Sequence, residues 1–278
     1  AATDEVSDIR SSGEGARDSA GAGVDTGRGD SGRGLTVATF NVWFEHHEHV
    51  RRWAALLAEV GRRQPDVIAF QEVTEPFLAQ LIATPWVREG YVLSDIDGRS
   101  YHGYGVMLLS RRRPTRIALH SMPSRMGRAL LVADFAGWPT VATIHLESLR
   151  PSRRYRDIQF ARCVDLLAGA EHAVLVGDMN FCATWTEENG RVPDSYTDVW
   201  PAVHGDDPGW TEDTDINAML ALRHSEVKQV RYDRVFVRSA GQLWRPRTIE
   251  RLGTEPIDPD GRLFPSDHFG LCARFERD

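Results

Sequence analysis

Cysteine is rare in this sequence of 278 residues, and Cys163, Cys182 and Cys272 lie far apart. They form no Cys-x-x-Cys pair, so the sequence offers neither the ligand spacing of a zinc site nor a disulfide framework. A protein without disulfides fits a reducing compartment. We therefore expect a cytoplasmic protein.

Long apolar runs are also absent from the sequence. No stretch approaches the roughly 20 apolar residues that a membrane-spanning helix needs, and the N-terminus lacks the apolar core of a signal peptide. The chain begins with Ala1 rather than methionine, which leaves a missing start residue or leader open. We expect no membrane partner, and we expect a monomer.

Lysine is almost absent, because Lys228 is the only lysine among 33 basic residues. The formal net charge is -7, so a nucleic-acid partner would need a local positive groove rather than a general positive field. The remaining positive charge is arginine, whose planar side chain suits bidentate contacts with phosphate.

Large apolar side chains are nearly missing from residues 1–34, which consist mainly of Gly, Ser, Ala, Asp and Arg. Such a segment cannot bury enough surface to become ordered, so we interpret it as a disordered tail. The remainder, residues 35–278, has an ordinary globular composition. Its length suggests one large domain or two small ones, and length alone does not decide between them.

Strand and helix patterns alternate through residues 35–278. Short apolar runs predict strands, and apolar residues at helical spacing predict helices. Strands are expected at 35–40, 66–70, 105–109, 129–135, 140–144, 173–176, 232–237 and 269–275, and helices at 46–63, 76–83 and 153–167. Residues 196–200 and 205–217 are expected to form a long polar loop. The pattern favours an α/β protein with helices covering two packed mixed sheets.

Polar residues follow the ends of several predicted strands. The most informative stretch is Ala173–Asn180, where a buried strand runs into a Gly-Asp-x-Asn turn. Reactive side chains collect at the carboxyl ends of strands in α/β sheets. The other strand-end groups are Asn41, Glu72, His145 and the Asp267–His268 pair. Each group alone is an ordinary turn residue, but their recurrence points to one catalytic cleft.

The residues of these motifs and their order along the chain resemble those of the endonuclease/exonuclease/phosphatase superfamily of metal-dependent phosphoesterases. The matching stretches are Thr39-Phe-Asn41, Phe70-Gln-Glu72, His145-Leu-Glu-Ser148, Gly177-Asp-Met-Asn180 and Ser266-Asp-His268. The resemblance implies a four-layer α/β sandwich, with two mixed, largely antiparallel sheets packed together and flanked by helices. Both sheets would contribute to one cleft.

Within that superfamily, the chain looks most like tyrosyl-DNA phosphodiesterases of the 5′-end type. His145-Leu-Glu-Ser-Leu-Arg150, Asp213-Thr-x-x-Asn217 after Trp210, and Tyr232-Asp-Arg-Val-Phe carry this finer resemblance. In one departure, Thr211 and Glu212 separate Trp210 from Asp213. The resemblance implies hydrolysis at DNA 5′ ends, including 5′-phosphotyrosyl links.

Site roles follow partly from chemistry and partly from the resemblance. Glu72 is the best metal ligand, with Asn41 near the metal and the phosphate. Oxygen ligands and a phosphate substrate suit Mg²⁺ or Mn²⁺. The resemblance assigns proton abstraction from the attacking water to Asp178, and alignment of that water to Asn180.

The remaining roles concern the phosphoryl oxygens and the substrate. His268 would donate to a non-bridging oxygen with Asp267 fixing its orientation, and His145 could supply a second donor. Glu147 would support neighbouring side chains rather than ligate metal. Trp210, Asn217, Arg128 and Arg150 are the candidate substrate-binding residues.

Two other interpretations remain open at this point. The chain could be a general nuclease, or a lipid or sugar phosphoesterase with the same chemistry. It could also be a catalytically inactive member that serves as a binding module. The Glu, Asp and His of the motifs are all present, which favours an enzyme.

Overall fold

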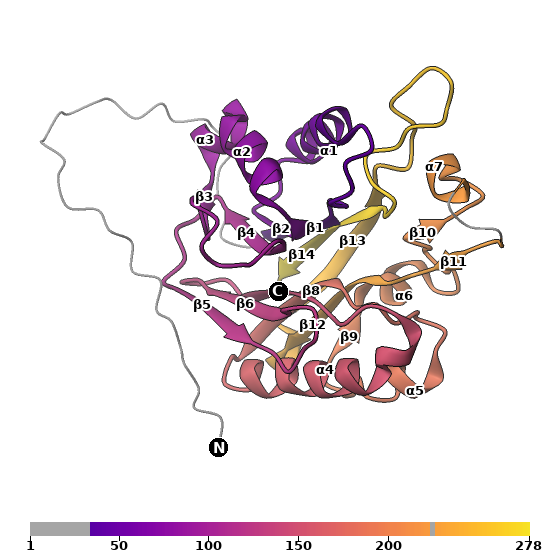
Figure 1. The fold of residues 1–278 in the computed structure, drawn as a ribbon. Helices are drawn as coiled ribbons and strands as arrows, with labels where there is room; N and C mark the ends of the chain where they lie inside the picture. The colour runs from indigo at the N-terminus through magenta and orange to yellow at the C-terminus, as the bar shows by residue number, and fades with distance from the viewer. Residues whose placement is uncertain (1–33, 223–225) are drawn as a thin grey trace, which may run out of the picture.

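The structure is a computed structural model that describes residues 34–222 and 226–278. Two six-stranded sheets pack face to face, with helices on both outer faces (Figure 1). This is the expected four-layer arrangement. The expected disordered tail at 1–34 lies outside the described residues, except for Gly34, which begins the first strand.

The first sheet has the strand order β13-β14-β1-β2-β4-β3. Its strands are β13 (Trp244–Leu252), β14 (Gly270–Arg277), β1 (Gly34–Asn41), β2 (Val67–Val73), β4 (Gly105–Ser110) and β3 (Val92–Leu93). Only β1 and β2 run parallel; the other neighbours are antiparallel. Helices α1 (His49–Arg63), α2 (Glu75–Ala83) and α3 (Pro85–Gly90) cover its outer face (Figure 1).

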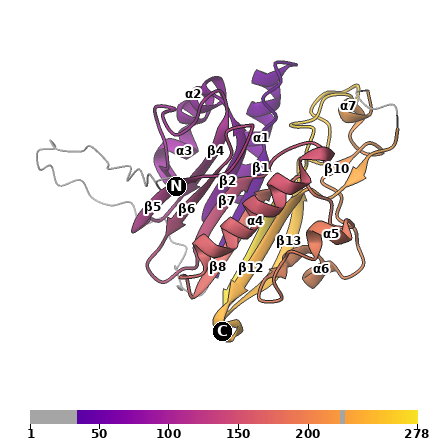
Figure 2. The same ribbon diagram turned by 60° about the horizontal axis from the view of Figure 1, so that its bottom comes forward.

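The second sheet has the strand order β5-β6-β7-β8-β12-β9. Its strands are β5 (Arg116–Ser121), β6 (Ala129–Asp134), β7 (Thr140–His145), β8 (His172–Asp178), β12 (Asp233–Ser239) and β9 (Thr197–Asp198). Here only β7 and β8 are parallel. Helix α4 (Arg153–Leu167) lies along the outer face of this sheet, as the turned view in Figure 2 shows.

The remaining elements are short. They are α5 (Thr186–Asn189), α6 (Val199–His204), α7 (Ala218–Ala221), the 3₁₀ turns η1 (Arg150–Ser152) and η2 (Ala240–Gln242), and a hairpin of β10 (Glu212–Asp213) with β11 (Gln229–Val230). The hairpin and α6 take up parts of the chain that we expected to be polar loop. Among the described residues, no helix is long and apolar enough to span a membrane.

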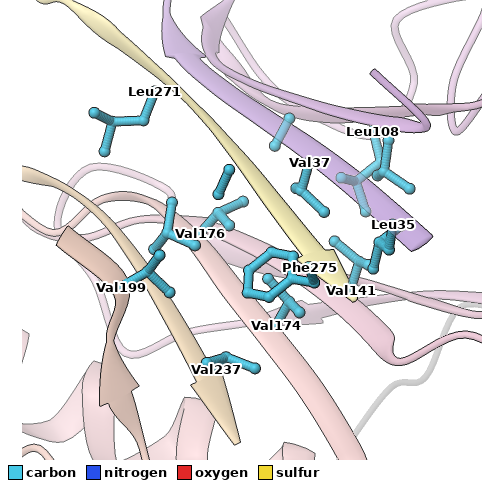
Figure 3. Close-up of a cluster of buried hydrophobic side chains, with 14 of the residues drawn as sticks. Leu35, Val37, Leu108, Val141, Val174, Val176, Val199, Val237, Leu271 and Phe275 are labelled. Carbon is cyan, nitrogen blue, oxygen red and sulfur yellow. The ribbon is translucent and has the colours of Figure 1, made fainter. Parts of the chain in front are cut away.

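The main core lies between the two sheets (Figure 3). Successive residues of a strand face opposite sides, so β8 sends Val174 and Val176 into this core and Leu175 toward α4. In β1, Val37 enters the same core while Phe40 packs under α1. This alternation fixes the register, because a slip of one residue would exchange the two faces.

Two of the longer strands, β5 and β13, were not expected from the sequence, nor were the two-residue strands β3, β9, β10 and β11. β13 carries only Trp244, Ile249 and Leu252 as buried residues, and Pro246 lies at an irregularity in its pairing with β14. β5 likewise has a single fully buried residue, Ala118. Both are edge strands, where polar side chains and proline are tolerated because one face and one edge meet solvent.

Candidate active site

The functional side chains meet because of the sheet topology. β1 ends at Asn41 beside the parallel β2, and β7 ends at His145 directly opposite Asp178 of the parallel β8. Carboxyl ends of parallel strands share one edge of a sheet. β12 runs antiparallel to β8 and starts at Asp233, which is paired in register with Asp178. The two sheets therefore bring their polar ends to the same side of the sandwich.

Asp178 is the centre of this cluster and is almost fully buried. Its Oδ2 accepts a hydrogen bond from Asn41 Nδ2 at 3.1 Å and lies 3.3 Å from His145 Nε2 and 4.0 Å from His268 Nε2. Its Oδ1 accepts from the backbone N–H of Asn180 at 2.9 Å. Burial works to raise the pKa of Asp178, but the nearby histidines and these hydrogen bonds lower it overall. Asp178 is thus a carboxylate that is able to accept a proton.

Asn41 joins the two sheets. Its Nδ2 also donates to Glu72 Oε1 at 3.2 Å, while its Oδ1 accepts from the backbone N–H of Trp43 at 3.0 Å. The NH₂ group of Asn41 therefore lies between two carboxylates, which makes Asn41 an orienting group for Glu72 and Asp178. Its role as a metal ligand stays a prediction, because Oδ1 has a second lone pair besides the one that accepts from Trp43 N–H.

Glu72 has the features expected of a metal ligand. It lies in a left-handed conformation with φ 61°, at the point where the pairing of β2 with β4 shifts register. Such strain in a non-glycine residue persists where the surroundings impose it, commonly at functional sites. Burial raises the pKa of Glu72, although Phe44 N–H, His268 and Asn41 oppose the shift. Its Oε2 accepts from Phe44 N–H at 3.1 Å.

The donor chemistry around Glu72 fits a hard divalent cation. In the part of the chain that the structure describes, no three His, Cys, Asp or Glu side chains converge closely enough to form an all-protein metal cage. Mg²⁺ is commonly held by one or two carboxylates together with water and substrate phosphate. Asp267 is a second carboxylate near Glu72. Desolvation and the charges of Glu72 and Glu212 raise its pKa to about 7, against the opposing effect of His268.

His145 is held in one tautomer by Arg128. The guanidinium Nη1 of Arg128 donates to His145 Nδ1 at 3.0 Å, so the ring proton lies on Nε2, which faces Asp178. Burial and the Arg128 charge hold the pKa of His145 well below its ordinary value. These surroundings favour the neutral ring with its proton on Nε2, and the role of His145 as a second donor stays a prediction.

Arg128 itself is not the free substrate contact that we expected. Its Nη2 donates to Ser148 Oγ at 2.7 Å, its guanidinium lies 5.3 Å from the Tyr104 ring centroid, and its side chain is almost fully buried. These contacts arise because β6 lies beside β7, which places Arg128 next to His145. Arg128 is a positioning residue for His145.

The orientation of His268 corrects another expectation. Its Nδ1 hydrogen-bonds to Asp233 Oδ2 at 2.7 Å, whereas Asp267 Oδ1 accepts a hydrogen bond from Ser266 Oγ at 3.3 Å. Asp233 can reach the ring because it begins β12, adjacent to Asp178. Burial works to lower the pKa of His268, but the charges of Asp233, Glu212 and Asp267 raise it well above its ordinary value. The three carboxylates therefore favour the imidazolium form of His268.

Asn180 retains the geometry needed to hold a water molecule. It follows Asp178 in a left-handed conformation with φ 51°. Its Nδ2 donates to the backbone carbonyl of Leu146 at 3.1 Å, which fixes the side chain against the end of β7. Its Oδ1 is the remaining polar atom that can accept from water. The water-aligning role of Asn180 remains a prediction.

The loop at 205–217, which carries the predicted substrate residues Trp210 and Asn217, contributes to the site through its contacts with the segment before β14. Asn217 is fully buried, donates to the Ser266 carbonyl at 2.9 Å and caps α7 by accepting from Leu220 N–H. It therefore positions the Ser266–His268 segment rather than contacting substrate. The Trp210 carbonyl accepts from Arg251 at 3.0 Å. Glu212, two residues further on, is the side chain of this loop that reaches His268.

Several aromatic and basic side chains lie next to the catalytic cluster. Phe44 is 37% exposed, and its ring centroid lies 5.0 Å from that of Tyr104. Tyr104 in turn lies 6.4 Å from the His145 ring. On another side, the exposed Arg150 lies over the Trp185 ring at 5.2 Å. The substrate roles of Arg150 and Trp210 stay predictions.

Sequence reasoning missed Asp233, Glu212, Phe44 and Tyr104. Asp233 carried a signal, because it lies in the recognisable Tyr-Asp-Arg-Val-Phe stretch and starts a strand. Its partner could be found only from the antiparallel register of β12 with β8. Phe44 and Tyr104 lie in loops with no periodic pattern.

Comparisons with known proteins agree with this geometry. The chain matches the endonuclease/exonuclease/phosphatase family over residues 38–268. Tyrosyl-DNA phosphodiesterase 2 of Bos taurus is 29% identical over 224 residues, covering 76% of this chain and 59% of that protein. The same enzyme of Xenopus tropicalis is 30% identical, again over 76% of this chain and 57% of that protein. The chain thus spans less than two thirds of these relatives.

Solved structures show the same fold. D. rerio TDP2, crystallised with a single-strand DNA product, aligns with a TM-score of 0.76 at 24% identity, over 87% of this chain and 99% of that chain. C. elegans TDP2 aligns with a TM-score of 0.74 at 24% identity, over 90% and 78% of the two chains. The sheet topology, the strand-end constellation and the match over most of the sequence together establish that this chain belongs to the endonuclease/exonuclease/phosphatase family.

Proposed function

We propose that this protein is a divalent-metal-dependent phosphodiesterase that hydrolyses phosphodiester bonds at DNA 5′ ends, including 5′-phosphotyrosyl links. The observation that carries the proposal is the convergence of Asn41, Glu72, Asp178 and His268 from both sheets around one point. The relatives named tyrosyl-DNA phosphodiesterase 2 support the DNA-end substrate.

The nucleophile in this proposal is water. Asp178 is an anionic, buried acceptor, and Asn180 lies two residues away with its amide group anchored to Leu146. A water molecule between them can donate one proton to Asp178 while Asn180 fixes its direction. Holding the reactants in line supplies much of the catalysis in phosphoryl transfer.

In this proposal the two histidines, His268 and His145, stabilise the negative charge on the phosphoryl oxygens. His268 is an imidazolium whose Nε2–H can donate to a non-bridging oxygen, and neutral His145 can donate through its own Nε2–H. Glu72, with Asp267 nearby, would hold the divalent cation, Mg²⁺ or Mn²⁺. When bound, that cation neutralises charge on the phosphoryl oxygens and steadies the leaving oxygen.

A substrate panel assayed with Mg²⁺ tests the proposal. It compares a 5′-phosphotyrosyl oligonucleotide, plain single- and double-stranded DNA, an abasic duplex, a small aryl phosphodiester and a phosphomonoester. We expect the highest kcat/KM for the 5′-phosphotyrosyl end. Preference for plain DNA would indicate a general nuclease, and activity only on non-nucleic phosphodiesters would indicate a lipid or sugar phosphoesterase. No turnover of any of these would contradict the proposal.

A further inference from the structure

We propose that Glu212 occupies, in the free protein, the place beside His268 Nε2 that a phosphoryl oxygen of the substrate takes on binding, and that Lys228 then binds the same phosphate. This inference rests on the proposed function and identifies two further substrate-binding determinants. Neither residue belongs to the strand-end motifs. Glu212 is the first residue of β10, and Lys228 directly precedes β11.

The first observation concerns the donor of His268. Its Nδ1 is engaged by Asp233, so Nε2–H is the single group that the ring can offer to a substrate. Glu212 Oε1 lies 3.3 Å from that Nε2. A carboxylate and a phosphoryl group present similar anionic oxygens to a donor, so the two compete for His268 Nε2.

The second observation concerns Lys228, the only lysine in the chain. Its ammonium group forms an ion pair with Glu212 Oε2, the other oxygen of the same carboxylate. The ammonium also lies 5.4 Å from the ring centroid of Tyr232, whose backbone carbonyl accepts from Met179 N–H inside the Gly-Asp-x-Asn turn. One carboxylate therefore bridges two cations next to the catalytic centre.

The third observation is that the backbone carrying Glu212 is firmly anchored. The carbonyl of Thr211 accepts from Phe269 N–H at 2.6 Å, and its N–H donates to the Val230 carbonyl. Its hydroxyl accepts from the N–H groups of Tyr232 and Asp233, both at 3.1 Å. The hairpin is thus tied to the strand ends on both sides of the site. Because this backbone is anchored, the proposed exchange is assigned to the Glu212 side chain rather than to movement of the hairpin.

The exchange has a simple electrostatic logic. While the site holds no phosphate, Glu212 compensates two positive charges that are largely shielded from solvent, since an unpaired buried charge is costly. A phosphate that enters the site brings equivalent anionic oxygens, which accept from His268 Nε2–H and from the Lys228 ammonium group in place of the Glu212 carboxylate. Glu212 therefore sets a threshold that only an anion with suitably spaced oxygens overcomes.

The test uses inorganic phosphate as the probe, measured as a competitive inhibitor of hydrolysis of a small aryl phosphodiester and by calorimetric titration. Lys228→Met should weaken phosphate binding by about 10-fold or more, as expected for loss of a charged hydrogen bond. Lys228→Arg should restore most of it. Glu212→Gln keeps the shape of the side chain but removes the competing charge, so phosphate should bind several-fold more tightly.

Arg63 and Glu250 provide the matched control, because they form an ion pair at the far end of α1. Arg63→Met and Glu250→Gln change the net charge equally and should leave phosphate binding unchanged. Unchanged binding in both Lys228→Met and Glu212→Gln, with wild-type binding intact, would overturn this inference alone. If Glu212→Gln fails to fold, the comparison of phosphate binding by Lys228→Met and Lys228→Arg still tests the inference. A wild-type protein that neither binds phosphate nor cleaves the diester would instead overturn the proposed function.

Discussion

Asp233 and His268 are coupled through a 2.7 Å hydrogen bond that no spacing in the sequence suggested. The negative charge of Asp233 favours the protonated ring and helps to raise the pKa of His268 above its ordinary value, against the effect of burial. A group with a raised pKa stays protonated to higher pH, and its contribution is lost as pH rises through that pKa. The activity should therefore decline on the basic side of the profile.

Asp233→Asn should move the basic limb of the kcat/KM profile to lower pH and reduce kcat by on the order of 10²-fold, because His268 loses both its charge partner and its fixed orientation. The measurement is the pH dependence of kcat/KM. Adding Asp233→Asn to His268→Ala should cause little further loss. A basic limb at its wild-type position would contradict the orienting role of Asp233 and favour Asp267 in that role. The same conclusion would follow if the losses of Asp233→Asn and His268→Ala simply multiplied in the double variant.

Tyr104 and Phe44 form an aromatic pair next to His145 and Glu72. Stacking of one base on an aromatic side chain contributes about 1–3 kcal/mol. Tyr104→Leu should therefore raise KM for a single-stranded DNA end about 10-fold or more and leave KM for a small aryl phosphodiester nearly unchanged. Tyr155→Leu is the matched control, since Tyr155 also lies 5.3 Å from an arginine but sits on α4. Equal losses on both substrates would contradict a stacking role.

The sequence predicted the residue types of the centre better than their contacts. Glu72, Asp178 and His268 follow or precede strands, and local apolar patterns located those strands correctly. Glu147 was also predicted correctly as a support, since it accepts from Ser124 Oγ and Arg125 N–H. The partners of Arg128 and His268 depend on which strands lie side by side. Local patterns do not contain that information.

At the scale of elements, the close approach of the parallel strands β7 and β8 depends on Gly177. Its φ of 134° lies outside the range that residues with side chains adopt comfortably. A Cβ at this position would lie 2.0 Å from the backbone carbonyl oxygen of Ile144. Since that carbonyl belongs to the neighbouring strand, relief requires separation of β7 from β8 next to Asp178.

Gly177→Ala should therefore lower the free energy of unfolding by more than about 2 kcal/mol and reduce kcat, because the same shift displaces Asp178. Denaturant unfolding and steady-state kinetics measure the two effects. Gly169→Ala is the control, since a Cβ there meets nothing within 4 Å. A Gly177→Ala protein with wild-type stability would show that the close approach of the strands is not required.

Helix α4 shows where periodicity predicted an element but only part of its buried face. The bounds Arg153–Leu167 were predicted, and Cys163 and Leu167 of the apolar side are buried, yet Ile158 is 44% exposed while Arg156 and Gln159 are buried. Arg156 donates to the carbonyls of Glu147 and Leu149, and Gln159 contacts Glu147. The polar face turns inward because it satisfies the backbone of the loop after β7. Apolar spacing alone could not reveal this requirement.

At the scale of the whole molecule, the centre is assembled from both sheets. Glu72 and Asn41 come from the first sheet, and Asp178, His145 and Asp233 come from the second. The four-layer packing could be predicted from the alternation of strands and helices together with the family resemblance. The edge strands β5 and β13 could not, because few of their side chains are buried.

Removal of divalent metal should abolish turnover, since Glu72 is a hard oxygen ligand and phosphoryl transfer requires charge neutralisation. Excess EDTA should eliminate activity, and Mg²⁺ or Mn²⁺ should restore it. Mg²⁺ should also raise the Tm of the wild-type protein but not that of Glu72→Gln, because a ligand that binds only the folded state stabilises it. Full turnover in EDTA would contradict a metal-dependent centre.

The central claim is that Asp178 activates water at a phosphodiester on a DNA 5′ end. The most direct measurement is the rate of tyrosine release from a 5′-phosphotyrosyl oligonucleotide in Mg²⁺, for the wild-type protein and for Asp178→Asn. We predict release that leaves a 5′-phosphate on the DNA, with kcat lower by on the order of 10²-fold or more in Asp178→Asn at an unchanged Tm. Equal release by the two proteins, or none by the wild type, would contradict the claim.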